Sequence, residues 1–170
     1  MVYKTKLQTV LSCLQEGKTL DVGCGDKRYT NRIPNSIGID PNSNFEGMTC
    51  IPDYIMSATD LEFPDGSFEN VTALDVLEHV QNPKLAINEA HRVLKPNGIL
   101  VIVDPNDDVL FWARIFAFRI REAIRGNPDH KHRFNSRNLK ILCDPQFKME
   151  KVIGRWIFTV YKFRRKSDEL

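Results

Sequence analysis

The sequence predicts an α/β protein, a three-layer sandwich around a seven-stranded, mostly parallel sheet. The short run 19–22 predicts a buried strand with Asp21 as its third residue, and two glycines follow it, as they do where a strand enters a ligand-binding loop. The run 99–103 is apolar throughout, which is typical of a strand buried on both faces. Near the carboxyl end, 147–153 and 156–162 read as a hairpin that supplies the antiparallel strand.

The chain begins with a predicted helix. Residues 3–15 carry apolar side chains at helical spacing, and Gly17 is placed to end the helix. We expect this helix, within 1–17, to cover one edge of the sheet, because amphipathic helices bury their apolar side. A length of 170 residues suits one domain with one sizeable core, so we expect 1–170 to form a single domain.

The first strand, 19–22, leads into a tight loop that contains Gly23 and Gly25. Glycine tolerates a positive φ and lets a ligand approach main-chain N–H groups without a Cβ in the way. Open α/β sheets bind nucleotides at such a loop. A dinucleotide fingerprint needs a third glycine where Arg28 stands, and Asp21 suits an ammonium or sulfonium group better than a phosphate. An NAD-binding oxidoreductase is therefore disfavoured.

The second strand, 37–40, ends in a carboxylate. One abbreviated helix within 28–35 must connect it to the first strand, because parallel strands need a crossover. Asp40 stands near the offset of the ribose acceptor in nucleotide-binding α/β units, and its carboxylate can take both ribose hydroxyls. After a loop at 42–52, we expect a third strand at 54–57.

The central strand is expected at 70–74, followed by a loop at 75–80. This loop faces the same crevice as the glycine loop, because the carboxyl ends of parallel strands share one edge of the sheet. His79 is the one ring in the loop that titrates near neutral pH, so it is a candidate catalytic base, with fixing the loop as its alternative role. Glu78 is expected to be solvated or to fix the loop.

The second half of the chain continues the alternation of predicted strands and helices. Residues 83–94 predict a surface helix that starts at a proline and crosses back over the sheet. A turn at 96–98 ends it before the strand 99–103. Asn135 or Ser136 is expected to cap a last helix that ends at Cys143.

Five segments in order carry a resemblance to a known family: 20–25, 38–40, 61–68, 75–80 and 92–98. In this order and spacing they resemble the motifs of class I S-adenosylmethionine-dependent methyltransferases. The most similar group is the type 11 branch, which includes quinone-methylating and other small-molecule enzymes. The resemblance implies a Rossmann-like sheet and methyl transfer from S-adenosylmethionine to a small or lipophilic acceptor.

The resemblance also implies which residues hold the cofactor. An acid orients its amino end, the glycine-loop backbone cradles the methionine portion, a second acid binds the ribose, and two residues hold the adenine. A further acid flanks the methyl site. The expected cofactor-binding residues are Asp21, Gly23, Cys24, Gly25, Asp40, Ser57, Ala58 and Asp75.

Two positions depart from the family pattern. Ser57 stands where the family places an acid for the adenine amino group, and Lys27 stands where it places a third glycine. The Lys27 ammonium is expected either to pair with the cofactor carboxylate or to be solvated. These departures support an alternative function, a degenerate, non-catalytic methyltransferase-like subunit that binds the cofactor or a partner protein.

The segment 107–125 is the most individual part of the chain, because it combines aromatic residues and arginines at helical spacing. It can be a lid over a lipophilic substrate, a membrane-surface element, a dimer contact or an ordinary core-packed helix. We favour a lid or substrate wall within 105–134. His132 is a further candidate for binding or base catalysis, but His130 and His132 have no third ligand nearby in sequence, so no metal site is expected.

Composition sets the remaining expectations. With 42% hydrophobic residues, 27% charged residues and a net charge of +2, the chain is typical of a soluble globular protein and favours no nucleic-acid partner. The four cysteines form no CxxC pair, so we expect a reduced, cytoplasmic protein. The sequence contains neither a bilayer-spanning apolar stretch nor a signal-peptide pattern.

Overall fold

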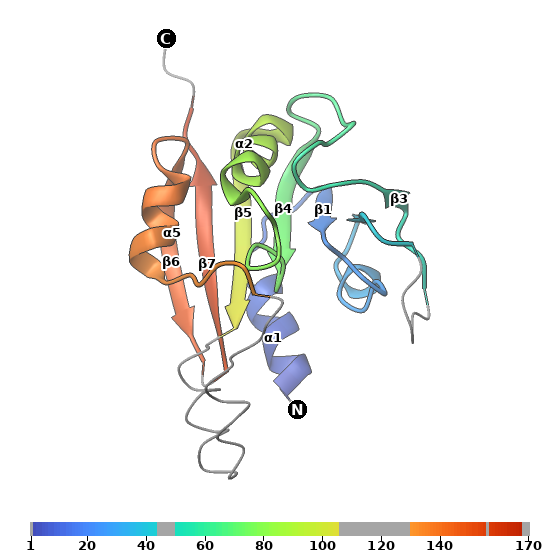
Figure 1. Ribbon diagram of the computed structural model, residues 1–170, viewed down its shortest axis with the longest axis horizontal. Coiled ribbons are helices and arrows are strands. Elements are labelled where there is room, and N and C mark those ends of the chain that lie inside the picture. Colours follow the sequence, from blue (N-terminus) through green and yellow to red (C-terminus); the bar gives the residue numbers. More distant parts are fainter. Residues whose placement is uncertain (1, 44–49, 106–129, 156, 168–170) are drawn as a thin grey trace.

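The computed structural model describes residues 2–43, 50–105, 130–155 and 157–167, and all following statements concern these residues (Figure 1). Seven strands form one sheet in the order β3-β2-β1-β4-β5-β7-β6. The helices are α1 (Val2–Leu11), η1 (Thr30–Arg32, a 3-10 helix), α2 (Pro83–Val93) and α5 (Ser136–Cys143). The strands are β1 (Thr19–Val22), β2 (Ser36–Asp40), β3 (Tyr54–Ile55), β4 (Phe68–Leu74), β5 (Leu94–Pro105), β6 (Phe147–Gly154) and β7 (Phe158–Arg165).

The strand directions confirm the predicted sheet. Strands β3, β2, β1, β4 and β5 pair in parallel, whereas β7 runs antiparallel to both β5 and β6. Strand β7 lies between β5 and β6 and runs in the direction opposite to every other strand of the sheet. The predicted hairpin supplies it, although β7 begins at Phe158, two residues later than expected.

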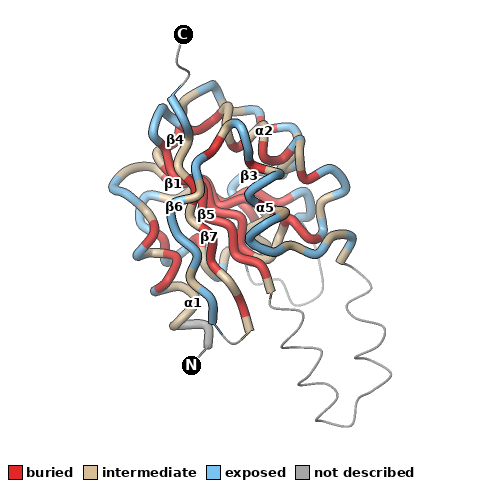
Figure 2. Tube along the Cα trace, turned by 90° about the vertical axis from the view of Figure 1, so that its left-hand side faces the viewer, coloured by how far each residue is buried: buried red, intermediate tan, exposed pale blue. Residues whose placement is uncertain are grey.

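Two buried clusters on opposite faces of the sheet give the protein its three layers. Alternate residues of β5 point to opposite faces. Leu100 and Ile102 belong to a core with residues of α2 and α5, whereas Val101 belongs to a core with Val10 and Cys13, from α1 and the turn after it. The central strands are accordingly buried along most of their length (Figure 2). Burial on both faces explains why β5 reads as a continuous apolar run.

The amino-terminal helix is shorter than predicted. It ends at Leu11, and the chain continues through turns rather than to Gln15. The reason lies in β4, where the fully buried Asn70 accepts a hydrogen bond from the Gln15 N–H (3.0 Å) and donates one to the Gln15 carbonyl (2.9 Å). These two bonds satisfy the Gln15 backbone outside a helix, so the chain leaves α1 early and enters β1 beside β4.

Two further boundaries differ from the sequence prediction. The crossover within 28–35 contains only η1, a single 3-10 turn. The turn predicted at 96–98 lies inside β5, where Leu94 pairs with Phe68 and Ile99 pairs with Asn70. Four residues of β5 therefore stand opposite one residue of β4, so the predicted turn is a bulge within a strand.

The helix predicted at 107–125 lies outside the described residues, as does most of the expected lid. The described part of that region, 130–134, runs back beside the loop after β4. The backbone N–H groups of Lys131 and His132 donate to the Glu78 carbonyl, at 2.7 and 3.2 Å. None of the described helices is long and apolar enough to cross a membrane.

Candidate active site

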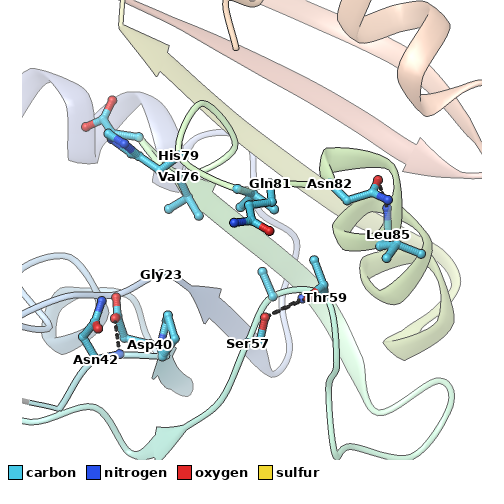
Figure 3. A pocket seen from close by; sticks show the side chains of 14 residues that line it. Gly23, Asp40, Asn42, Ser57, Thr59, Val76, His79, Gln81, Asn82 and Leu85 are labelled. Atoms are coloured by element: carbon cyan, nitrogen blue, oxygen red, sulfur yellow. Dashed lines mark hydrogen bonds between the residues drawn. The ribbon is translucent and has the colours of Figure 1, made fainter. Parts of the chain in front are cut away.

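A pocket of about 610 Å³ opens at the carboxyl ends of β1, β2 and β4 (Figure 3). Five of the eight predicted cofactor-binding residues line it, namely Gly23, Asp40, Ser57, Ala58 and Asp75. His79 lines it as well, and Figure 3 shows this side chain and Val76 across the pocket from Asp40 and Asn42. The topology thus brings residues from four separate segments to one edge of the sheet, as predicted for parallel strands.

The glycine loop has the left-handed backbone that the sequence predicts. Gly23 and Gly25 have φ angles of 66° and 54°. A Cβ on Gly23 would lie 2.5 Å from Cγ2 of Val76, so the loop after β4 packs directly on this glycine. The Cys24 N–H donates to the Ile39 carbonyl at 2.9 Å, which fixes the loop to β2.

Lys27 keeps the backbone conformation that a glycine would have there. Its φ is 58°, a left-handed value that costs a non-glycine residue about 1–2 kcal/mol. Its ammonium lies 2.6 Å from Oδ1 of Asp53, and the lysine side chain is mostly buried. The partner of Lys27 in this structure is therefore Asp53, rather than solvent.

Asp40 has spare hydrogen-bonding capacity at the pocket. Its Oδ2 accepts a hydrogen bond from the Gly25 N–H (3.0 Å), and its Oδ1 accepts one from the Asn42 N–H (2.9 Å). Each carboxylate oxygen has a second lone pair. The side chain is thus held in place by two backbone donors and can still accept two hydroxyl hydrogen bonds.

Asp21 is buried beneath the loop instead of lining the pocket. Its Oδ1 accepts from the Thr72 hydroxyl (2.7 Å) and its Oδ2 from the Thr30 hydroxyl (2.6 Å). Burial raises the pKa of this carboxyl to about 6, although the two hydroxyl donors oppose the shift. In this structure Asp21 ties β1 to β4 and η1, and its contact with the cofactor amino end stays a prediction.

Cys24 also points away from the pocket. A Cβ on Gly38 would lie 2.8 Å from the Cys24 Sγ, so this sulfur packs against the backbone of β2. Burial, with Asp21 and Asp40 nearby, raises the pKa of the thiol to about 12. The thiol is therefore inert at neutral pH, and the part of Cys24 that can serve a ligand is its backbone.

Ser57 and Ala58 form part of the pocket rim. The Ser57 hydroxyl lies 2.8 Å from the Thr59 hydroxyl and accepts a hydrogen bond from the Thr59 N–H at 3.2 Å. Ser57 also pairs with Asp60 in a single antiparallel β-bridge. This turn places an exposed hydroxyl at the position expected for adenine.

Asp75 forms an ion pair that the sequence did not reveal. Its backbone has a φ of 58°, and its carboxylate bonds to the ammonium of Lys6 in α1. That ammonium also lies 5.4 Å from the ring centroid of Phe158 and 5.9 Å from that of Tyr29. Helix α1 therefore supplies the cation that pairs with an acid of the pocket wall, and sequence periodicity gave no signal for this contact.

The loop after β4 also presents a buried acid beside two histidines. Glu78 is 1% exposed, and neither carboxylate oxygen has a hydrogen-bond partner among the described residues. Burial raises its pKa to about 8, reinforced by Asp104 and Asp75. The sequence had indicated a solvated or loop-fixing carboxylate, and the solvated interpretation is wrong because this side chain is buried.

The two candidate histidines have different surroundings. His79 lines the pocket, and its ring centroid lies 5.0 Å from that of His130 in an edge-to-face arrangement. Its Nε2 lies 3.9 Å from Oε1 of Glu78. His132 is not among the lining residues, and its Nε2 lies 3.4 Å from the Gln81 carbonyl. His79 is therefore the better placed of the two for contact with a ligand.

Most of the sheet and the pocket lie in a part of the chain that matches a known family. Residues 20–102 match the family described as "Methyltransferase domain". These residues belong to the methyltransferase family. The matched range contains all five motifs on which the resemblance rested, so that prediction is confirmed.

Relatives of this methyltransferase domain include enzymes named for quinone substrates. A 2-methyl-6-phytyl-1,4-hydroquinone methyltransferase of Synechocystis sp. is 32% identical over an alignment of 128 residues, and the match covers 61% of this chain and 39% of that protein. A ubiquinone biosynthesis O-methyltransferase of Rhodopseudomonas palustris is 31% identical over an alignment of 108 residues, and the match covers 56% of this chain and 43% of that protein. The chain spans less than half the length of either relative.

Solved structures of methyltransferases share the fold. An S-adenosylmethionine-dependent methyltransferase of Thermotoga maritima, described as a possible histamine N-methyltransferase, matches with a TM-score of 0.75 at 19% identity. The match covers 96% of this chain and 89% of that one. The family and its structural neighbours imply S-adenosylmethionine as the cofactor, as predicted. The site fits such a group, because its volume of about 610 Å³ lies in the range of ~300–1,000 Å³ usual for ligand pockets.

Proposed function

We propose that this protein transfers a methyl group from S-adenosylmethionine to a small, lipophilic acceptor. The observation that carries the proposal is the pocket in which Gly23, Asp40, Ser57 and Asp75 meet at the carboxyl ends of the parallel strands. Each comes from a different segment of the chain, and together they offer a backbone cradle, a hydroxyl acceptor, an adenine rim and an acid.

Each of these residues would contact a different part of the cofactor. Asp40 would accept the ribose hydroxyls, and Ser57 with Ala58 would border the adenine. Gly23 would let the methionine portion approach the backbone, and Asp75 would flank the methyl. When bound, S-adenosylmethionine supplies the methyl as an electrophile on a sulfonium centre. The protein then mainly has to hold the acceptor in line with that methyl.

The acceptor side of the pocket supports a lipophilic substrate. Three aliphatic side chains of the pocket wall, Val76, Val80 and Leu85, follow β4, and Leu85 is 47% exposed. The quinone-related names of two relatives agree with such a wall. A ring with an aliphatic substituent would bury apolar area there, at about 25 cal/mol per Å².

Calorimetric titration of the purified chain with S-adenosylmethionine, its demethylated product and NAD tests the cofactor. We expect both sulfur nucleotides to bind and NAD not to bind. Asp40→Ala should lose tenfold or more in affinity, about 1.4 kcal/mol. Asp65→Ala is the matched control, because Asp65 pairs with Arg92 and is not among the residues that line the pocket.

Turnover is tested with radiolabelled S-adenosylmethionine and a panel of hydroquinones that differ in their aliphatic tails. Methylation that increases with tail length supports the proposal. Binding of the cofactor without turnover of any acceptor, alone or with cell lysate, would instead support the degenerate-subunit alternative. If neither sulfur nucleotide binds at millimolar concentration, the proposal is overturned.

A further inference from the structure

Three potential metal ligands meet beside the pocket. Glu78, His79 and His130 each offer one atom, a carboxylate oxygen or an imidazole nitrogen, and these atoms lie within 4.8 Å of one another. Two of the residues come from the loop after β4, and the third is 51 positions further along the chain. The hydrogen bonds from Lys131 and His132 to the Glu78 carbonyl hold the two segments together.

The second observation is the Glu78 carboxylate itself. It is 1% exposed, and neither oxygen has a hydrogen-bond partner among the residues that the structure describes. An isolated buried carboxylate costs several kcal/mol unless a cation or hydrogen-bond donors compensate it. The Nε2 atom of His79 lies 3.9 Å from Oε1 of Glu78, which is too distant for a hydrogen bond. The carboxylate therefore faces the histidines with its coordinating capacity unused.

The surrounding charges favour a dication. The charged groups whose fields act on Glu78 are the carboxylates of Asp104 and Asp75 and the ammonium of Lys6. With Glu78 ionised, as a metal-ligating carboxylate must be, three carboxylates face one ammonium. An ion of charge +2 would balance this excess, whereas a second lysine or arginine is absent from the same set of described groups.

We propose that Glu78, His79 and His130 bind a divalent first-row transition-metal ion, such as Zn²⁺. One carboxylate and two imidazoles are a ligand set that Zn²⁺ and Fe²⁺ accept, and three protein ligands leave at least one coordination position open. Bonds of about 2.0–2.1 Å place tetrahedral ligand atoms about 3.3 Å apart. The histidines must therefore move slightly closer, which the 43% exposed side chain of His79 permits.

The location gives this site a role in the proposed methyl transfer. His79 lines the pocket, so an ion bound to it would stand at the pocket wall near Asp75. The open coordination position of the ion would bind an oxygen or nitrogen atom of the methyl acceptor and orient that atom. This role rests on the proposed function, but binding of the ion does not.

Titration of the tag-free, chelator-treated full chain with Co²⁺ and Zn²⁺ tests the site. We expect one Co²⁺ per chain, with visible absorption bands that Zn²⁺ displaces. Glu78→Gln, His79→Ala and His130→Ala should each weaken binding at least tenfold. His132→Ala should leave the affinity unchanged, because its ring bonds to the Gln81 carbonyl and lies outside the cluster. Circular dichroism and thermal unfolding verify that each variant is folded.

Two outcomes would overturn the metal site. One is a wild-type chain that binds Co²⁺ no more tightly than the triple variant of Glu78, His79 and His130. The other is a loss in His132→Ala equal to that in His130→Ala. Titration of S-adenosylmethionine on the same samples separates the two proposals, because cofactor binding without metal binding overturns the metal site alone.

Discussion

Lys6 in the first helix forms an ion pair with Asp75 at the end of the central strand, 69 positions away in sequence. The lysine side chain is 12% exposed and the aspartate side chain 37%. The pair joins α1 to the pocket wall, so the helix that covers one face of the sheet also fixes a residue expected to flank the methyl.

Replacing Lys6 by Met should destabilise the protein. The methionine keeps much of the packing against Phe158 and Tyr29 but leaves the Asp75 carboxylate without its cation. Since Oδ1 of Asp75 is already buried without a hydrogen-bond partner among the described residues, we expect a loss of about 1–3 kcal/mol. Urea unfolding at pH 7.5 measures it.

The control for Lys6→Met is Lys95→Met. Lys95 pairs with Glu69, but its side chain is 50% exposed, and such surface pairs contribute about 0–1 kcal/mol. Equal losses in the two variants would contradict a special role for the pair between α1 and β4.

Replacing Asp21 by Asn should change how stability depends on pH. Burial raises the pKa of Asp21 from 3.8 to about 6, so the folded state holds this proton more tightly than the unfolded state. Stability from this group is present below pH 3.8 and is lost as pH rises to about 6, a total of about 3 kcal/mol. The amide carries no charge and escapes this loss.

Urea midpoints of wild type and Asp21→Asn between pH 4 and pH 8 measure the effect. We expect the stability of the variant relative to wild type to rise by about 2.5 kcal/mol across this range, mostly below pH 6. The difference between the two proteins isolates Asp21, because all other carboxyls titrate in both. Parallel curves would show that Asp21 does not titrate as described.

A methyl group on Gly23 should disrupt the pocket. Gly23→Ala combines a left-handed φ of 66° with a Cβ 2.5 Å from Val76 Cγ2. We expect more than about 2 kcal/mol of destabilisation from strain and overpacking, and at least tenfold weaker binding of S-adenosylmethionine by calorimetry.

Gly66→Ala separates backbone strain from the close contact. Gly66 has a φ of 63°, but a Cβ there would meet nothing within 4 Å. It should cost only the strain of about 1–2 kcal/mol and leave cofactor affinity unchanged. Equal effects of the two variants would mean that the contact with Val76 is unimportant.

Restoring an acid at position 57 should tighten cofactor binding. Ser57→Asp replaces a neutral acceptor with a charged one at the adenine rim, and a charged hydrogen bond adds about 1–2 kcal/mol over a neutral one. We therefore expect about a tenfold lower dissociation constant for S-adenosylmethionine. Ser67→Asp adds the same charge outside the pocket, and an equal gain in that variant would attribute the effect to net charge instead of to adenine.

Local patterns predicted much of the framework. The glycine loop, the run 99–103 and the acid at the end of β2 each depend on neighbours in sequence, so their roles could be inferred from a short window. The Asn135 cap is similar, because its side chain accepts from Arg137 and Asn138 N–H groups only two and three residues away.

Contacts between distant segments decided the rest. The early end of α1 depends on Asn70, and the partner of Lys27 is Asp53. The meeting of Glu78 with His130 depends on the return of 130–134 beside the loop after β4. In each case the two groups that meet lie too far apart in the chain for a short sequence window to contain both.

The sequence by itself determined the order of strands and helices, the glycine loop and the acids at or next to the ends of the first two strands. Hydrophobic periodicity and backbone preferences are local properties, and they suffice for those features. Only the tertiary structure decided which charges are paired and which carboxylates are buried. Ion pairing and desolvation depend on distances through space, which one-dimensional spacing does not fix.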